Sequence, residues 1–182
     1  MRGSDGYTIL HVCGECTQPI TRLLWDMLER DGLVPSVFYE GDIRDAETFD
    51  AAMRSRAQLY VGYPGGGDWL PAAMSWLTDQ AGRAVRIHFC FFRHGRRHAL
   101  PLARLFLESL LAWPCRDGRP LYQTVYGMLP ESNAPALSFG RRLGFQTLGV
   151  LPGGAWIEHA GRTEGLAVNY ITAELLKEAS HG

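Results

Sequence analysis

A run of basic side chains lies between two apolar segments and has the composition of a phosphate site. Residues 91–102 read Phe-Phe-Arg-His-Gly-Arg-Arg-His-Ala-Leu-Pro-Leu, and they join a strand-like segment to a helix-like one. The first turn of a helix exposes backbone N–H groups and the positive end of the helix dipole, so it attracts anions. Arginine adds planar, bidentate hydrogen bonding to phosphate oxygens. The candidate ligands are the basic members of this run: Arg93, His94, Arg96, Arg97 and His98.

The charge of the whole chain is uneven in a way that singles out the same region. The net charge is −1 over 182 residues, yet residues 83–119 hold 8 basic and 2 acidic groups, a balance of +6. Residues 1–82 hold 6 basic and 12 acidic groups, a balance of −6. A basic segment also suggests nucleic-acid binding. Because this one lacks regularly interleaved aromatic residues and the rest of the chain is acidic, nucleic acid is the less favoured partner.

Composition restricts the class of protein. With 46% hydrophobic and 20% charged residues, the chain can bury a core, which excludes intrinsic disorder. The length predicts one domain, residues 1–182. No run of about 18 apolar residues is present, so we expect no membrane span, and we expect no signal peptide. Four cysteines do not make a disulfide framework in a chain of this length, and we expect a cytoplasmic protein.

Hydrophobic periodicity predicts the elements that must position the basic run. Strands are expected at 7–12, 58–63, 85–92, 121–128, 145–150 and 166–172, with a turn at 152–154 between the last two. Helices are expected at 20–28, at 46–54 and after the basic run, which is expected to be a loop. Residues 69–78 suit a strand, although their Ala-Ala-Met sequence also suits a helix. This order predicts a mixed α/β (α+β) sheet in one domain.

Residues 129–145 carry a second pattern, which a capped helix explains by itself. Ser132 or Asn133 caps that helix and Gly144 ends it. The pattern also resembles the closing motif of the GNAT acyltransferases, commonly Asn-x-x-Ala-x-x-Phe-Tyr-x-x-x-Gly-Phe. The residues that carry this resemblance are Asn133, Ala136, Phe139, Leu143, Gly144 and Phe145. The match covers most of the chain in element order and residues 83–150 at the level of motifs.

The resemblance implies a GNAT-like fold, a mostly antiparallel mixed sheet with a splayed central strand at 85–92, flanked by helices. It implies acetyl-CoA or another acyl-CoA as co-substrate and an amine of a small molecule or protein as acceptor. The implied CoA ligands are Phe91, Phe92, Arg93, Arg96, Arg97, His98, Ala99, Leu100, Asn133 and Phe139. The usual glycines of the pyrophosphate loop are replaced by Ala99 and Pro101, and Pro101 has no N–H. This altered loop is similar to that of acetyltransferase-like proteins of phages and prophages.

The resemblance implies a general acid and a general base, and this sequence lacks the usual acid. Many family members carry a tyrosine acid at the position that Gly140 occupies here, and Ser138 or Tyr126 are the hydroxyls that remain as substitutes. The general base is expected to be His88, whose ordinary pKa near 6.5 suits deprotonation of an ammonium group. Glu131 is the second choice. A non-catalytic protein of the same fold, binding a CoA-like ligand or a protein partner, is the alternative.

A cysteine pair and an acidic stretch bear on whether the protein binds a metal ion or a cationic acceptor. Cys13 and Cys16 form a Cys-x-x-Cys, but no second cysteine pair follows, so we expect no metal site. Residues 26–50 hold eight carboxylates against Arg30 and Arg44, where the family builds its acceptor pocket. A cationic amine acceptor fits this charge, as does a solvated helix face. A homodimer is left open.

Overall fold

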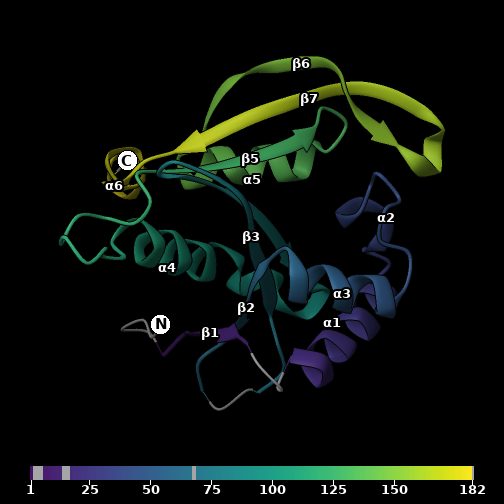
Figure 1. Ribbon diagram of the computed structural model, residues 1–182, viewed down its shortest axis with the longest axis horizontal. Coiled ribbons are helices and arrows are strands. Elements are labelled where there is room, and N and C mark those ends of the chain that lie inside the picture. Colours follow the sequence, from purple (N-terminus) through teal and green to yellow (C-terminus); the bar gives the residue numbers. More distant parts are fainter. Residues whose placement is uncertain (2–5, 14–16, 67–68, 182) are drawn as a thin grey trace.

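A single mixed sheet organises the computed structural model, which describes residues 1, 6–13, 17–66 and 69–181. Its seven strands lie in the order β1-β2-β3-β4-β5-β7-β6 (Figure 1). The strands are β1 (Thr8–Val12), β2 (Gln58–Tyr63), β3 (Ala73–Ala81), β4 (Ala84–Phe91), β5 (Thr124–Pro130), β6 (Gln146–Ile157) and β7 (Arg162–Ile171). All neighbours pair antiparallel except β4 and β5, which are parallel. The predicted α/β class with one mostly antiparallel sheet is confirmed.

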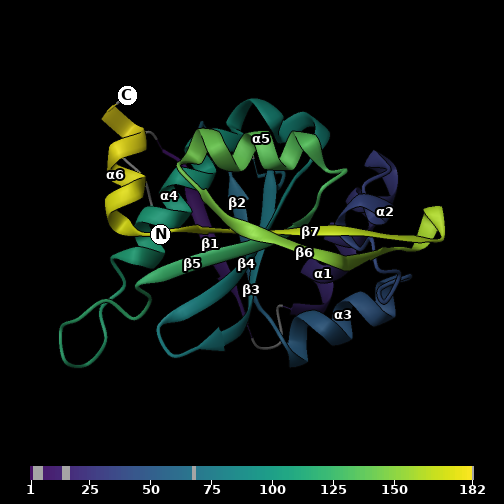
Figure 2. The ribbon, with the colours of Figure 1, turned by 90° about the horizontal axis from the view of Figure 1, so that it is seen from above.

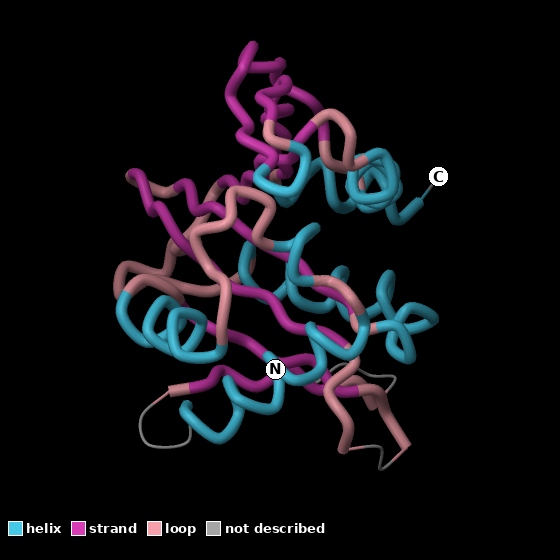
Figure 3. Tube along the Cα trace, turned by 90° about the vertical axis from the view of Figure 1, so that its right-hand side faces the viewer, coloured by secondary structure: helices cyan, strands magenta, loops and turns pink. Residues whose placement is uncertain are grey.

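Helices cover both faces of this sheet (Figures 2 and 3). One face is covered by α1 (Thr17–Asp31), α2 (Val34–Val37) and α3 (Ala46–Ser55). The other is covered by α4 (Ala99–Leu111), α5 (Ala134–Leu143) and α6 (Ala173–His181). Two 3-10 helices complete the described chain, η2 (Arg93–His98) and η3 (Glu158–Ala160). None of the helices in these ranges has the length and apolarity needed to cross a bilayer.

The alternation of β4 explains why the sheet has two covered faces. Val85 and Ile87 are buried in the cluster formed with α4, whereas Cys90 belongs to the cluster formed with α1 and α3. Successive side chains of a strand point to opposite faces, so an apolar residue at nearly every position requires cover on both sides. Burial of each such side chain contributes about 1.5–3 kcal/mol.

The sheet splits in its centre. β4 and β5 pair over only three residues each, Ala84–Arg86 against Thr124–Tyr126. Beyond that point β4 continues to Phe91 in register with β3, and β5 continues to Pro130 in register with β7. Each strand therefore stays with its outer neighbour, and the two diverge. The expected splayed central strand is confirmed.

The turn expected at 152–154 is wrong. These residues lie inside β6, which continues to Ile157, and the chain reverses at η3 and Gly161, whose φ is +58°. The glycines instead allow a bulge, since the register shifts between Leu151 and Ala155. A Cβ on Gly154 would lie 2.9 Å from the Leu166 Cβ, so glycine permits the close approach of β6 and β7 here.

Several other elements also differ from what the sequence predicts. The strand alternative for 69–78 is correct, shifted to β3 (Ala73–Ala81), and the helix alternative is wrong. The short α2 and the C-terminal α6 were not predicted. The loop expected at the basic run is η2, which continues directly into α4.

Candidate functional site

The basic run lies where β4 ends and α4 begins, on the 3-10 helix η2. Several backbone N–H groups of this turn are already bonded. The N–H of Arg93 donates to Asp31 Oδ2 at 2.6 Å, that of Gly95 to Phe92 O at 2.8 Å, and that of Ala99 to Arg96 O. The 3-10 turn thus uses N–H groups that a free helix N-terminus would expose. An anion placed at this point would therefore meet mainly the basic side chains.

Those side chains form an exposed cationic surface. Arg93, His94, Arg96 and Arg97 are exposed, and His98 is half-buried. Arg97 Nε donates to His98 Nε2 at 2.9 Å, and His98 Nδ1 lies 3.0 Å from the Tyr7 hydroxyl. The structure therefore brings the predicted phosphate ligands together, with Arg97 oriented by His98.

Gly95 fixes this turn against the sheet. A Cβ on Gly95 would lie 2.1 Å from the carbonyl oxygen of Ala72. The same carbonyl accepts the N–H of Phe92 at 3.1 Å. The required glycine is therefore at 95, within η2, and not at the two positions where the family pattern places its glycines.

The apolar CoA candidates are already packed in the protein. Phe92 is fully buried among the residues of α1 and α3, whereas Phe91 meets Phe139 edge to face with ring centroids 5.1 Å apart. Asn133 caps α5 by accepting the Ala136 N–H at 3.3 Å, which confirms the cap. The first turn of α4 is half-buried, and Leu100 packs on the core beneath it.

His88 lies on the opposite face of β4 from α4, in contact with Trp76 and Thr78. Its ring stacks on Trp76 with centroids 4.7 Å apart and planes 3° apart, and Nε2 lies 3.2 Å from the Thr78 hydroxyl. Burial, reinforced by Arg86 and opposed by Asp79, lowers the pKa of His88 to about 3. The ring is therefore neutral at pH 7, and far less basic than the sequence argument assumed.

A cavity of about 510 Å³ opens on this face, between α2, α3 and strands β3 and β4. Its inner wall includes Trp76, Arg86 and His88, and Tyr39 borders it from the segment after α2. Charged residues of both signs also line it: Glu40, Asp42, Arg56 and Asp79. Of these residues, only His88 was predicted from the sequence as a site residue. The alternation that placed Arg86 and His88 on one face of the strand was the available signal.

The other acid–base candidates lie at separate positions. The Tyr126 hydroxyl donates to the backbone oxygen of Asp79 at 3.0 Å, and burial raises the pKa of this phenol. Ser138 is exposed on α5, and the exposed Glu131 lies against Gly165 of β7, where a Cβ would meet its Oε2. A Cβ on Gly140 would meet only Phe145 Cβ at 3.7 Å, so there is space for a side chain.

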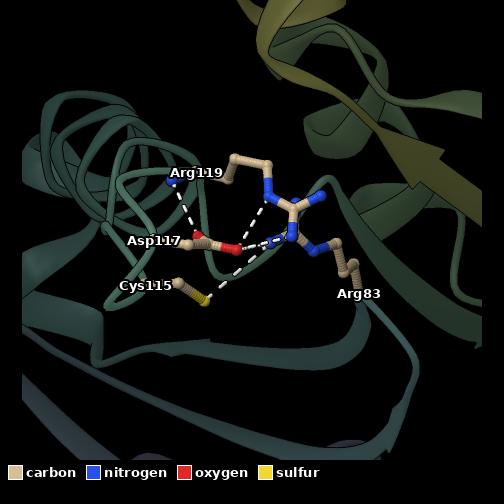
Figure 4. Close-up of polar contacts among 4 residues, drawn as sticks. All are labelled: Arg83, Cys115, Asp117 and Arg119. Carbon is tan, nitrogen blue, oxygen red and sulfur yellow. Dashed lines mark hydrogen bonds and ion pairs between the residues drawn. The ribbon is translucent and has the colours of Figure 1, made fainter.

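In the folded protein, the basic residues of segment 83–119 lie at separate positions. Arg83 and Arg119 meet at the loop after α4, where both contact the Asp117 carboxylate and Arg83 also contacts Cys115 Sγ at 4.0 Å (Figure 4). Arg104 packs against α6 and donates to Ala179 O at 3.2 Å. The sequence balance of +6 is therefore not one surface, and its strongest exposed part is η2.

The cysteines supply no metal site in the described chain. Cys13 is exposed, and Cys16, the other cysteine of the Cys-x-x-Cys, lies outside the described residues. Residues 1, 6–13, 17–66 and 69–181 contain no group of three or more His, Cys, Asp or Glu side chains placed to hold a metal ion.

Comparison with solved structures identifies the fold of this chain. No family model and no curated protein matches the sequence. A probable acetyltransferase of the GNAT family from Chromobacterium violaceum matches with a TM-score of 0.73 and 19% identity, over 97% of this chain and 92% of that chain. This chain has the GNAT acetyltransferase fold.

The GNAT fold is shared with proteins of different acceptors. The spermidine N-acetyltransferase from Vibrio cholerae, in complex with CoA and spermine, matches with a TM-score of 0.66 and 13% identity, over 94% of this chain and 98% of that chain. The ribosomal-protein-S18-alanine N-acetyltransferase from Escherichia coli matches with a TM-score of 0.62 and 13% identity, over 91% and 93%. At these identities the likeness establishes the fold alone.

Proposed function

We propose that this chain is an acyl-CoA-dependent N-acyltransferase that transfers an acyl group, acetyl in the simplest case, to an amine. The observation that carries the proposal is the position of the exposed arginines of η2 at the end of the splayed strand β4. A phosphate bound there would lie beside the gap between β4 and β5, so the rest of a long acyl-CoA could extend along β4. The GNAT fold supports this arrangement.

Individual side chains fit the parts of such a co-substrate. Arg96 and Arg97 offer guanidinium groups to the pyrophosphate, with Arg93 and His98 beside them. Ala99 and Leu100 lie in the turn beneath, and Phe91 and Phe139 meet beside the gap, with Asn133 at the start of α5. Phe92 is fully buried on the α1 and α3 face, so only its backbone could contact the co-substrate. The likeness of this loop to phage and prophage acetyltransferase-like proteins remains part of the proposal.

The reaction requires little acid–base chemistry from the protein. The ammonium first loses a proton to water. The neutral amine then attacks the thioester carbonyl, a C–N bond forms, the C–S bond breaks, and the thiolate takes up the proton that the nitrogen loses. With a pKa of about 3, His88 is a poor base for an ammonium group. We assign it the role of a neutral hydrogen-bond partner that orients the amine in the cavity.

The alternative is a non-catalytic protein that binds a CoA-like ligand or a protein partner. The glycine at position 140, the missing loop glycines and the low pKa of His88 favour it. Incubation with acetyl-CoA and a panel of amines, followed by mass spectrometry of the products, separates the two. The enzyme proposal predicts an acetylated amine and stoichiometric free thiol. Tight acetyl-CoA binding without any product would establish the alternative.

A further inference from the structure

We propose that the acceptor is an amine that also carries a carboxylate, such as an amino acid, and that Tyr39 and Arg86 bind this carboxylate in the 510 Å³ cavity. The inference rests on the proposed acyltransferase function and adds the substrate class. It comes from two donors in the cavity wall that the protein leaves without a partner.

The two donors are the Tyr39 hydroxyl and Arg86 Nε. Each atom is buried and makes no hydrogen bond of normal geometry among the described residues, although the Glu40 and Arg86 side chains lie close enough to the Tyr39 hydroxyl to shift its pKa. A buried donor without a partner is destabilising, so native proteins leave few of them. Both side chains line the same cavity. The two atoms are themselves covered, so a small side-chain rotation would be needed to present them to an oxygen acceptor in this space.

The surroundings hold both donors in place. The Tyr39 ring packs against Ala155, Ile157 and Leu166 under the β6–β7 ribbon, and its backbone oxygen accepts the Glu158 N–H at 2.9 Å. In Figure 1 the end of this ribbon lies beside α2. Burial raises the pKa of Tyr39, so the phenol keeps its proton and remains a donor at neutral pH.

Arg86 is fixed from the other side. Its Nη1 bonds Asp79 Oδ2 at 3.3 Å, and its side chain is 21% exposed. Asp79 has a φ of +47°, which is uncommon for a residue other than glycine, and it lies where β3 shifts register. One edge of the guanidinium is thus neutralised and anchored by Asp79, and the buried Nε makes no hydrogen bond within the described protein. A carboxylate fits because a planar guanidinium and a hydroxyl can each donate to one of its oxygens.

The remaining wall suits the rest of such a molecule. Trp76 and Ile43 offer apolar surface, while Glu40 and Asp42 give a negative field that attracts the ammonium form toward the mouth. His88 lies two positions along β4 from Arg86 on the same face, so a bound amino acid would place its nitrogen near this ring. The cavity thus complements both charges of a zwitterion.

The test uses matched pairs of amines that differ only in the carboxylate: phenylalanine with phenethylamine, lysine with cadaverine, and 4-aminobutyrate with propylamine. We expect kcat/KM to be at least tenfold higher for one or more carboxylate-bearing members than for their partners. Tyr39→Phe and Arg86→Lys should each reduce this kcat/KM about tenfold, and change that of the decarboxylated partner less than twofold. The control Tyr170→Phe removes a phenol outside the cavity and should leave both values unchanged.

Tyr39→Phe also separates binding from folding. Because the hydroxyl has no partner, its removal should leave the free energy of unfolding unchanged or raise it while the kcat/KM falls. Equal or reversed preference within every pair, or variants that leave the preference intact, would overturn the assignment. Acetyl-CoA binding without turnover of any carboxylate-bearing amine would also overturn it. Absence of acetyl-CoA binding would overturn the acyltransferase proposal itself.

Discussion

Phe91 at the end of β4 and Phe139 on α5 meet edge to face, with ring centroids 5.1 Å apart and planes 65° apart. The contact joins β4 to the helix that follows β5, although β4 pairs with β5 itself only as far as Arg86. Two rings therefore connect the strand that precedes the basic turn to the helix of the second sequence motif. A ligand that runs along β4 in this gap would pass beside them.

This contact predicts measurable coupling. Phe91→Leu and Phe139→Leu should together destabilise the protein by less than the sum of the single changes, by about 0.5–1.5 kcal/mol, since an aromatic pair contributes this much beyond its area. Urea unfolding of the two single variants and the double variant measures the difference. Strict additivity would show that the two rings do not stabilise one another.

Because Gly95 packs closely against the sheet, we predict that one added methyl group at this position lowers the free energy of unfolding. Gly95→Ala places a Cβ 2.1 Å from Ala72 O, so the turn or the strand must move, at a cost of about 1–3 kcal/mol. The midpoint of thermal unfolding should fall by roughly 2–4 °C per kcal/mol. Gly149→Ala is the matched control, because a Cβ there meets nothing within 4 Å. An equal effect of the two changes would refute the role of Gly95.

The buried His88 predicts a pH dependence of stability. Its folded pKa of about 3 lies below the ordinary 6.5, so between these values the unfolded chain binds more protons than the folded one. The stabilisation is complete above pH 6.5 and is lost as the pH falls toward 3, at up to about 1.4 kcal/mol per pH unit.

Substitution of His88 isolates this contribution. His88→Phe keeps a ring on Trp76 but cannot be protonated, so its free energy of unfolding should fall less steeply between pH 6.5 and 4.5 than that of the wild type. Urea unfolding at three pH values in this range measures both slopes. Parallel slopes would mean that His88 titrates normally in the folded protein.

The open space at Gly140 predicts a gain of function. If the acyltransferase lacks a general acid, Gly140→Tyr should raise kcat with the best acceptor, and Gly140→Phe, which has the same size without the hydroxyl, should not. Both changes should also stabilise α5 by roughly 0.5 kcal/mol, because glycine is a poor helix former. An equal effect of the two variants on kcat would show that the hydroxyl is not the missing group.

The regular elements could be predicted because their sequences carry local signals. The alternation of residues 85–91 identified β4 and its two faces, and Asn133 with Gly144 marked both ends of α5. The turn at 152–154 failed because Pro-Gly-Gly ordinarily ends a strand, whereas here the pairing with β7 continues through a bulge. The composition of residues 152–154 alone cannot show that the strand continues through them in register with β7.

The candidate site was predictable only where it is contiguous. The arginines of η2 lie together in the sequence and remain together in the structure. Tyr39 and Arg86 are 47 positions apart in the chain, and their proximity depends on the β6–β7 ribbon that packs Tyr39 beside β4. No period or spacing encodes that contact. The reverse holds for residues 83–119, which are contiguous in the chain but whose basic side chains lie at separate positions in the folded protein.

Calorimetric titration of the protein with acetyl-CoA tests the central claim most directly. The proposal predicts binding that Arg96→Ala plus Arg97→Ala weakens about 100-fold, since each charge-assisted hydrogen bond contributes about 1.5–3 kcal/mol. Arg141→Ala plus Arg142→Ala removes a matched exposed pair from the last turn of α5 and should leave the affinity unchanged. No binding by the wild type, or equal affinity of the two double variants, would contradict an acyl-CoA site at η2.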